Sequence, residues 1–201
     1  MSTQSLILPH DPLLTTELDH FDFENPPEEP TEIAKKLFDV LNEKNGLGLA
    51  ANQIGLSHRV FIMRGNPCTL CFNPEITHYS DEQAMMEEGC LTYPDLFVKI
   101  RRSENIEAKW TNELGEEQTS VLEGLTARVF QHELDHLNGV NYLQRANPYH
   151  VQQAKKLMKK MKRRKKHEYF RPVADVSHLV QDQDVISTEI SDELFTLDTG
   201  D

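Results

Sequence analysis

The stretch QHELDHLNG, residues 131–139, places two histidines and two acidic residues within a few positions of one another. Apolar residues recur at helical spacing from residue 125 onward, so we expect a helix over residues 125–137. On that helix, His132 and His136 lie one turn apart on one face, where both imidazoles can bind the same metal ion. Glu133 then has the place of the general base in an HExxH metal site. The plainer alternative is an exposed helix face with two incidental histidines.

A catalytic metal site of this kind needs a third protein ligand, because it usually combines three protein ligands with one open position. The histidines and acidic residues downstream lie in or beside strongly charged segments and are poor candidates. Cys90, in EEGCLTYP at residues 87–94, is a better one, since a thiolate binds soft and borderline metals strongly. Leu91 offers a backbone N–H beside it. The alternative for Cys90 is a small buried apolar residue, which is the usual environment of a free cysteine.

A third stretch, GLGLAANQIG at residues 46–55, is rich in glycine and alanine. Small residues of this kind let the backbone approach a ligand closely. Gln53, near the end of the stretch, carries an amide that could donate a hydrogen bond to a developing oxyanion. Taken alone the pattern is weak, because a turn of small residues after a helix is common.

Together, the three stretches resemble the signature motifs of the peptide deformylases, which are GxGxAAxQ, EGCLS and QHExDHL. This chain has GLGLAANQ, EGCLT and QHELDHL in the same order. The resemblance extends over roughly residues 5–165 and includes NPEI at residues 73–76. Thr92 stands where the family usually has serine, and both side chains carry a hydroxyl.

The resemblance implies an α+β fold in which antiparallel sheets pack around the HExxH helix, with a basic helix at the C-terminal side. It implies a metal-dependent hydrolase that removes the N-formyl group from the N-terminal formyl-methionine of newly made polypeptides and releases formate. The implied site consists of the metal ligands Cys90, His132 and His136, the general base Glu133, and the oxyanion-stabilising amides of Gln53 and Leu91.

The resemblance also implies a pocket for the methionine side chain. Met86, Leu125, Val129 and His132 are expected to line it, and Gly46, Gly48 and Gly89 are expected to contact the peptide backbone. For Leu125 and Val129, ordinary burial in the helix core is an equally simple explanation. The residues leave the metal open: two imidazoles and a thiolate suit Zn²⁺, whereas the resemblance implies Fe²⁺ in cells, with Ni²⁺ and Co²⁺ as further active ions.

Composition favours one domain with an extension. Of the 201 residues, 38% are hydrophobic and 27% are charged, and the net charge of -12 argues against attraction of nucleic acid by the protein as a whole. No apolar run approaches the ~20 residues that span a bilayer, and three cysteines favour a reducing cytoplasm. We expect a catalytic domain over residues 1–167 and a poorly ordered acidic tail over 168–201, with room for a short strand at 185–190.

Turn residues and spacing predict the remaining elements. A helix is expected to follow an N-cap at Thr31 and to stop at Asn45-Gly46. The expected strands are residues 59–63, 70–72, 97–100, 106–110 and 118–122. The second strand should end at Asn73-Pro74, and the last three should form an antiparallel meander.

A helix over residues 149–166 has an unusual charge, because it contains KKLMKKMKRRKK at residues 155–166. Its partial apolar stripe comprises Val151, Ala154, Leu157, Met158 and Met161. One interpretation is a solvated helix that docks by this stripe. The other is contact with ribosomal RNA, as in deformylases whose C-terminal helix binds the ribosome, and such contact would be salt-sensitive.

Some alternatives stay open. Arg102 is either a strand surface charge or a structural arginine that braces the site through nearby acidic groups. Asp135 should point away from the metal, into either a supporting or a solvated position. Cys68 and Cys71 do not suit a zinc knuckle, since residues three apart on a strand point to opposite faces. As rival functions, an HExxH enzyme could cut ordinary peptide bonds, or an inactive relative could serve as a binding module.

Overall fold

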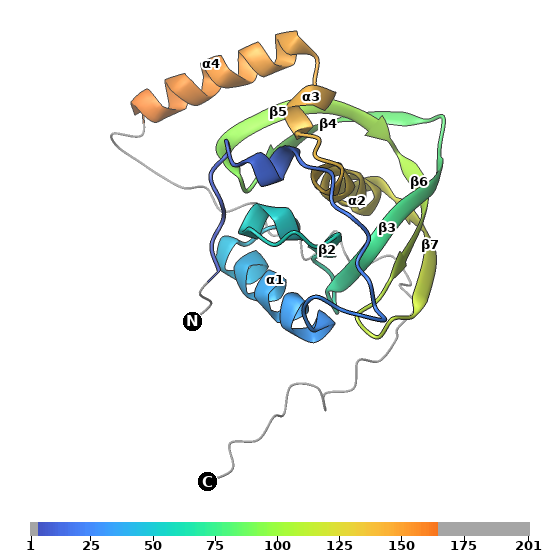
Figure 1. Cartoon of the computed structure of the whole chain (residues 1–201). Helices are drawn as coiled ribbons and strands as arrows, with labels where there is room; N and C mark the ends of the chain where they lie inside the picture. Colours follow the sequence, from blue (N-terminus) through green and yellow to red (C-terminus); the bar gives the residue numbers. More distant parts are fainter. Residues whose placement is uncertain (1–3, 165–201) are drawn as a thin grey trace.

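The central feature of the computed structural model is helix α2 (Gly124–Leu137), which carries the HExxH sequence. Antiparallel strands surround it on several sides, with helix α1 (Pro30–Lys44) beyond strand β2 (Figure 1). The structure describes residues 4–164. This arrangement confirms the expected α+β class and the expected packing of antiparallel sheets around the HExxH helix.

Seven strands form two antiparallel sheets in the described part of the chain. The five-stranded sheet has the order β1-β2-β3-β6-β7, and β4 pairs with β5 in a separate two-stranded sheet. The strands are β1 (Gly48–Ala50), β2 (Val60–Met63), β3 (Thr69–Tyr79), β4 (Gln83–Cys90), β5 (Tyr93–Ser103), β6 (Asn105–Thr111) and β7 (Glu117–Glu123).

The expected three-strand meander is wrong in one of its two pairings. Strands β6 and β7 form the expected hairpin, but β5 pairs with β4 rather than with β6. Strand β6 instead takes β3 as its other neighbour. The strand β4 was not predicted from the sequence, because its polar and exposed residues lack a clear alternating pattern.

Strand β3 does not end at Asn73-Pro74, contrary to expectation. Asn73 has a positive φ of 50°, and the register with β6 shifts between Phe72 and Glu75. The Asn73 side chain accepts a hydrogen bond from the Phe21 N–H and donates one to the Phe21 carbonyl. A bulge of this kind accommodates the proline within the strand, so pairing resumes beyond it.

Helix α1 begins one residue earlier than its expected N-cap at Thr31. Pro30 occupies the first helical turn, where its fixed φ suits the helix and its missing N–H costs no bond. The helix ends as expected at Asn45, whose left-handed φ of 51° stops it. The buried face consists of Ile33, Leu37, Val40 and Leu41.

The main core lies between α2 and the five-stranded sheet. Phe130 of α2 packs edge-on against Phe61 of β2, with ring centroids 5.0 Å apart. Leu134 and Ile106 belong to the same buried cluster. Burial of this face fixes the distance between α2 and the sheet. The position of the two histidines follows from that packing.

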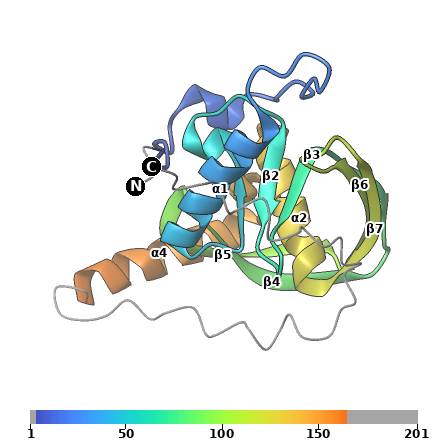
Figure 2. The ribbon, with the colours of Figure 1, turned by 90° about the horizontal axis from the view of Figure 1, so that it is seen from below.

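The short helix α3 (Tyr142–Arg145) leads into the basic helix α4 (Pro148–Arg164). Helix α4 lies beside β5 and projects beyond the rest of the described chain (Figure 2). Of its expected apolar stripe, Val151, Ala154 and Met158 pack against the core, whereas Leu157 and Met161 are exposed. The expected tail at 168–201, including the strand at 185–190, lies outside the described residues.

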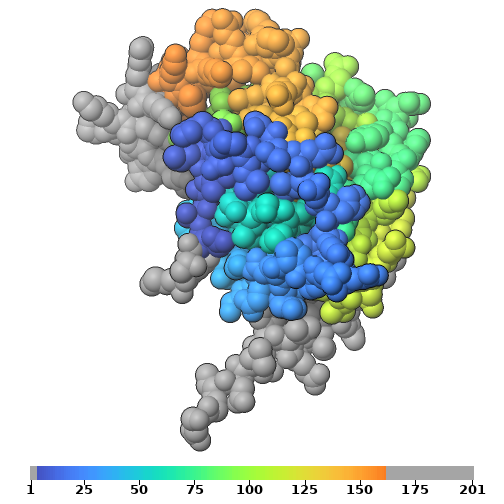
Figure 3. Space-filling model, viewed as in Figure 1, coloured from blue at the N-terminus to red at the C-terminus, as the bar shows by residue number. Residues whose placement is uncertain are grey.

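The N-terminal segment crosses one face of the molecule between α4 and α1 (Figure 3). The Ile7 N–H donates to the Gln53 carbonyl at 2.9 Å, and the Asn52 side chain reaches the Leu13 carbonyl. These bonds fasten the segment to the 3-10 helix η2 (Ala51–Ile54), which follows β1. Among residues 4–164, no helix is both long and apolar enough to cross a membrane.

Candidate metal centre

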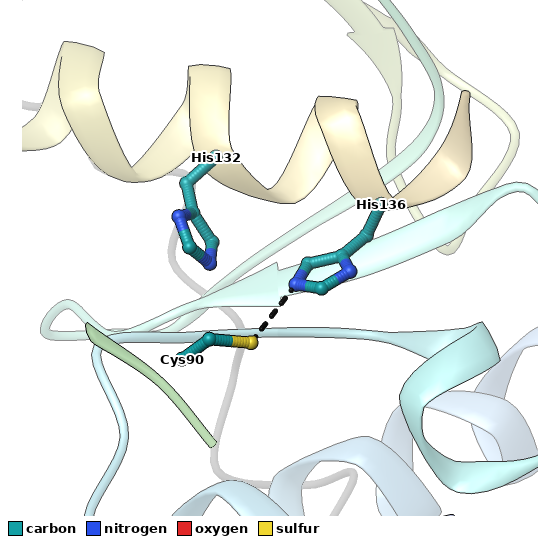
Figure 4. Close-up of side chains that lie close together, drawn as sticks. All are labelled: Cys90, His132 and His136. Atoms are coloured by element: carbon teal, nitrogen blue, oxygen red, sulfur yellow. Dashed lines mark hydrogen bonds between the residues drawn. The ribbon is translucent and has the colours of Figure 1, made fainter. Parts of the chain in front are cut away.

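Helix α2 brings His132 and His136 to one face, as the HExxH spacing predicts. Their rings lie 5.1 Å apart, and both side chains point toward the strand that carries Cys90 (Figure 4). The Asn52 side-chain amide donates to the His136 carbonyl at 2.6 Å, which ties the last turn of the helix to η2. Both histidines are buried, so the alternative of an exposed helix face is wrong.

Cys90 lies at the end of β4, directly opposite the two histidines. Its Sγ is 3.2 Å from His136 Nε2. Burial opposes ionisation of this thiol, but the neighbouring His136 and His132 outweigh it and lower the pKa of Cys90 well below its ordinary value. The thiolate is the form in which cysteine binds metals, so a lowered pKa suits Cys90 to that role.

The three side chains fit a metal ion. One ligand atom from each of Cys90, His132 and His136 lies within 4.8 Å of the other two. Ligands around a tetrahedral zinc-like ion lie ~3.5 Å apart, given metal–ligand bonds of about 2.0–2.3 Å. The donor set of one thiolate and two imidazoles suits such an ion. In residues 4–164, this is the one cluster of three or more potential ligands at such short range.

Glu133 lies beside the cluster and is 4% exposed. Its Oε2 has no hydrogen-bond partner within the described part of the chain. Burial raises the pKa of Glu133 to about 7 against the opposing effect of the two histidines. Gly48 of β1 faces this carboxylate, because a Cβ there would lie 2.4 Å from Glu133 Oε1. A buried carboxyl group with a free oxygen and a pKa near neutrality suits proton transfer.

The structure also brings Gln53 to the cluster. Its amide Nε2 lies 3.4 Å from Cys90 Sγ and donates to Thr92 Oγ1 at 3.1 Å. Its Oε1 accepts from the Ala50 N–H at 2.8 Å, so the amide orientation is set from both ends. Leu91 follows Cys90 directly and packs with the core cluster beside α1. Both residues therefore lie next to the candidate ligands.

Behind His132 lies a group of buried charges. Glu88 Oε2 accepts from His132 Nδ1 at 3.0 Å, and Arg102 donates to both oxygens of Glu88. Burial opposes ionisation of Glu88, but the hydrogen bonds from His132 and Arg102 lower its pKa to about 2. For Arg102, the structure thus supports the bracing alternative over a surface charge. A ligand histidine commonly donates its second N–H to a carboxylate in this way.

Asp135 is buried rather than solvated. Its Oδ2 accepts from Arg102 Nη1 at 2.8 Å, and its Oδ1 accepts from Arg145 Nη2 at 2.5 Å. Two further buried charged residues were not predicted from the sequence: Glu88, which belongs to the EEGC motif, and Arg128, which donates to Glu88 at 2.6 Å. A charged residue at position 128, on the face shared by Leu125, Val129 and His132, was the available signal.

The expected pocket residues lie on elements next to the cluster, with different exposure. Met86 of β4 is 39% exposed, while Leu125 and Val129 of α2 are partly buried. A Cβ at Gly89 would lie 2.6 Å from the Phe97 ring, and one at Gly46 would lie 2.9 Å from Leu91. Val129 packs against the main core cluster, as its simpler alternative expects, and the contacts of all these residues with a peptide stay a prediction.

A thiolate and two imidazoles beside a buried carboxylate on an HExxH helix define the class of metal-dependent hydrolases. Residues 4–152 match the family model described as polypeptide deformylase. A peptide deformylase of Thermotoga petrophila is 45% identical over 115 residues, which cover 57% of this chain and 70% of the relative. One from Wolbachia sp. subsp. Brugia malayi is 38% identical over 146 residues, covering 66% and 82%. The chain belongs to the polypeptide deformylase family.

Solved structures agree with this assignment. The crystal structure of peptide deformylase from Thermotoga maritima has a TM-score of 0.68 and 38% identity, with coverage of 72% of this chain and 98% of that one. The actinonin complex of a peptide deformylase from Synechococcus elongatus has a TM-score of 0.72 and 27% identity, with coverage of 79% and 87%. The protein is thus a metal-dependent hydrolase that removes the N-formyl group from formyl-methionine of new polypeptides and releases formate.

Proposed function

We propose that Cys90, His132 and His136 hold one divalent metal ion and that Glu133 is the general base of the reaction. The observation that carries this assignment is the buried, unpartnered Oε2 of Glu133 next to three converging ligand atoms. When bound, the ion would polarise the formyl group and lower the pKa of water from about 15.7 to near 7. Rival hydrolysis of ordinary peptide bonds has less support, because the family match covers all three motifs.

In the proposed reaction, different residues transfer the proton and stabilise the developing negative charge. Glu133 takes a proton from the attacking water, whose oxygen bonds to the formyl carbon. The former carbonyl oxygen gains negative charge, which the Gln53 amide and the Leu91 N–H stabilise. As the carbon–nitrogen bond breaks, Glu133 delivers its proton to the departing amine. The products are formate and a polypeptide with a free N-terminal methionine.

The candidate site also needs a metal ion and a pocket for the methionine side chain. The donor set accepts Zn²⁺, Ni²⁺ or Co²⁺, and we propose Fe²⁺ as the ion in cells because the chain resembles a family that uses it. We propose that Met86, Leu125 and Val129 receive the methionine side chain. A solved relative from Acinetobacter baumannii, 31% identical, binds Met-Ala-Ser, a peptide that begins with methionine.

Compartment and domain limits are also proposals. Three free cysteines support action in a reducing compartment, and we propose the cytoplasm. We propose residues 1–167 as the catalytic domain and residues 168–201 as a separate acidic tail. The family match, residues 4–152, lies within the proposed catalytic domain.

Gln53→Ala is expected to lower kcat for formate release from formyl-Met-Ala-Ser by about 10²–10³-fold, because one oxyanion donor contributes about 2.7–4 kcal/mol to the transition state. Thr92→Val is the matched control, since it removes the 3.1 Å bond to Gln53 and keeps the amide. We expect a much smaller loss in that variant. An unchanged rate in folded Gln53→Ala would overturn the oxyanion role.

We further propose that α4 contacts ribosomal RNA. Helix α4 contains no acidic residue, and its side chains at Lys155, Lys156, Lys159 and Lys160 are exposed. Leu157 and Met161 are exposed on the same helix, at 57% and 43%, so a partner could cover apolar as well as charged groups. Phosphate contacts by such lysines give affinity that falls steeply with salt.

The double variant Lys156→Glu/Lys160→Glu should weaken ribosome binding and reduce the slope of log affinity against log salt by about 1 for each lysine. Formate release from the tripeptide should stay unchanged, because α4 lies outside the candidate metal centre. The control is Lys35→Glu/Lys109→Glu, which alters two exposed lysines elsewhere. Equal weakening in both double variants, measured by ribosome co-sedimentation, would argue against a specific role for α4.

A further inference from the structure

Arg128 of α2 is a charged residue buried at 4% exposure, and its guanidinium makes contacts on two strands. Its Nη1 donates to Glu88 Oε1 at 2.6 Å and to the Ile100 carbonyl of β5 at 3.1 Å. Its Nη2 donates to the Ala84 carbonyl of β4 at 2.7 Å. One side chain therefore joins the HExxH helix to both strands of the β4–β5 sheet.

Arg128 and His132 bind different oxygens of the Glu88 carboxylate. Arg128 donates to Oε1 of the carboxylate, while His132 Nδ1 lies 3.0 Å from Oε2. Arg102 donates to both oxygens, from Nε at 2.7 Å and Nη2 at 2.9 Å. Each Glu88 oxygen therefore has two partners. Oε1 binds Arg102 and Arg128, and Oε2 binds Arg102 and His132.

The position of Arg128 along the chain couples these contacts to the metal centre. Arg128 and His132 are one helical turn apart on the same face of α2. Cys90 ends β4, the strand whose Ala84 carbonyl accepts from Arg128. The candidate ligands thus come from two separate elements, and Arg128 bonds directly between those elements.

We propose that Arg128 is a positioning residue that sets the spacing of α2 from the β4–β5 sheet and fixes Glu88, and so orients His132 toward the metal. This inference rests on the proposed ligand set. Buried charge pairs are a poor source of net stability, because desolvation offsets much of their attraction. Partners of a ligand histidine, by contrast, typically change metal affinity or activity by about 10–100-fold.

The test measures Co²⁺ affinity of the full chain by competition with a chelator, together with the thiolate-to-Co²⁺ absorption band. Arg128→Met keeps a long unbranched side chain without the charge, and Arg128→Lys keeps the charge without the fork of donors. Each variant is made in the native background and with Glu88→Gln. The control is Arg59→Met, which removes a partly buried arginine bonded to Leu137 and Asn138 but not to Glu88.

We expect Arg128→Met to weaken Co²⁺ binding by about 10–100-fold and to alter the absorption band, with Arg128→Lys recovering part of the affinity. In the Glu88→Gln background, the same change should have little further effect, because the two residues act through one contact. If Arg128→Met fails to fold, Arg128→Lys with and without Glu88→Gln gives the same comparison of Co²⁺ affinities.

Two results would overturn the inference. Unchanged affinity in folded Arg128 variants is one, and an equal loss with and without Glu88 is the other. Arg59→Met should lower the thermal midpoint while Co²⁺ affinity stays at the native value. The ligand set is checked separately, since Cys90→Ala should abolish the thiolate band of the native protein. A native protein without that band would contradict the ligand set, whereas changes confined to Arg128 variants concern the positioning role.

Discussion

Replacing Glu133 with glutamine is expected to lower kcat for formate release from formyl-Met-Ala-Ser by about 10²–10⁴-fold, the range for loss of a general acid–base group. Glutamine keeps the size of the side chain and its place beside Gly48, but it cannot take a proton from water. The buried and unpartnered Oε2 of Glu133 is the structural reason to expect so large an effect. Measurements with saturating substrate separate kcat from KM.

The interpretation of that result depends on the metal. Glu133 is not among the three clustered ligand residues, so Glu133→Gln should hold as much metal as the native protein. Metal content is measured on the same samples as formate release. A variant that retains its metal and more than about a tenth of the native kcat would show that another group moves the proton.

Replacing Cys90 with alanine is expected to remove both the metal and the activity. The thiolate supplies one of three candidate ligands, and its Sγ is 3.2 Å from His136 Nε2. Loss of a direct ligand should exceed the roughly 10–100-fold cost of losing a partner behind a ligand. Affinity for Zn²⁺ or Co²⁺, measured against a chelator, and metal content after dialysis give the two readouts.

Cys68→Ala is the matched control for that experiment. Cys68 is a partly exposed free cysteine outside the ligand cluster. Its replacement should leave metal content and formate release at native levels, so nonspecific effects of removing a thiol are excluded. Native metal affinity in Cys90→Ala would mean that a different set of residues binds the ion.

Local spacing could predict the elements whose buried residues recur regularly within one short segment of the chain. Helix α2 was expected at residues 125–137 and runs over Gly124–Leu137, since its apolar residues recur with the helical period. Helical geometry alone also brings His132 and His136 to one face. The chemistry of a thiolate made Cys90 a candidate third ligand, but nothing local relates residue 90 to residue 132, so the full ligand set rested on the motif resemblance.

Pairing between distant strands could not be predicted from local pattern. Strand β4 buries only two of its eight residues and shows no regular alternation, so it was not predicted, and β5 was assigned the wrong neighbour. Strand β3 continues past Asn73-Pro74 because the Asn73 side chain bonds to the backbone of Phe21, more than fifty residues away. The residues around Pro74 give no indication of a contact with such a distant part of the chain.

By itself, the sequence determined the HExxH helix and, through its three motifs, the family and the candidate ligands. Only the tertiary structure decided which charges lie behind them: Glu88, Arg102, Arg128 and Asp135 come from β4, β5 and α2 and meet in one buried group. The physical reason is that periodicity reports which face of an element is buried, whereas a buried ion pair depends on which faces meet. That meeting is set by packing across the whole domain.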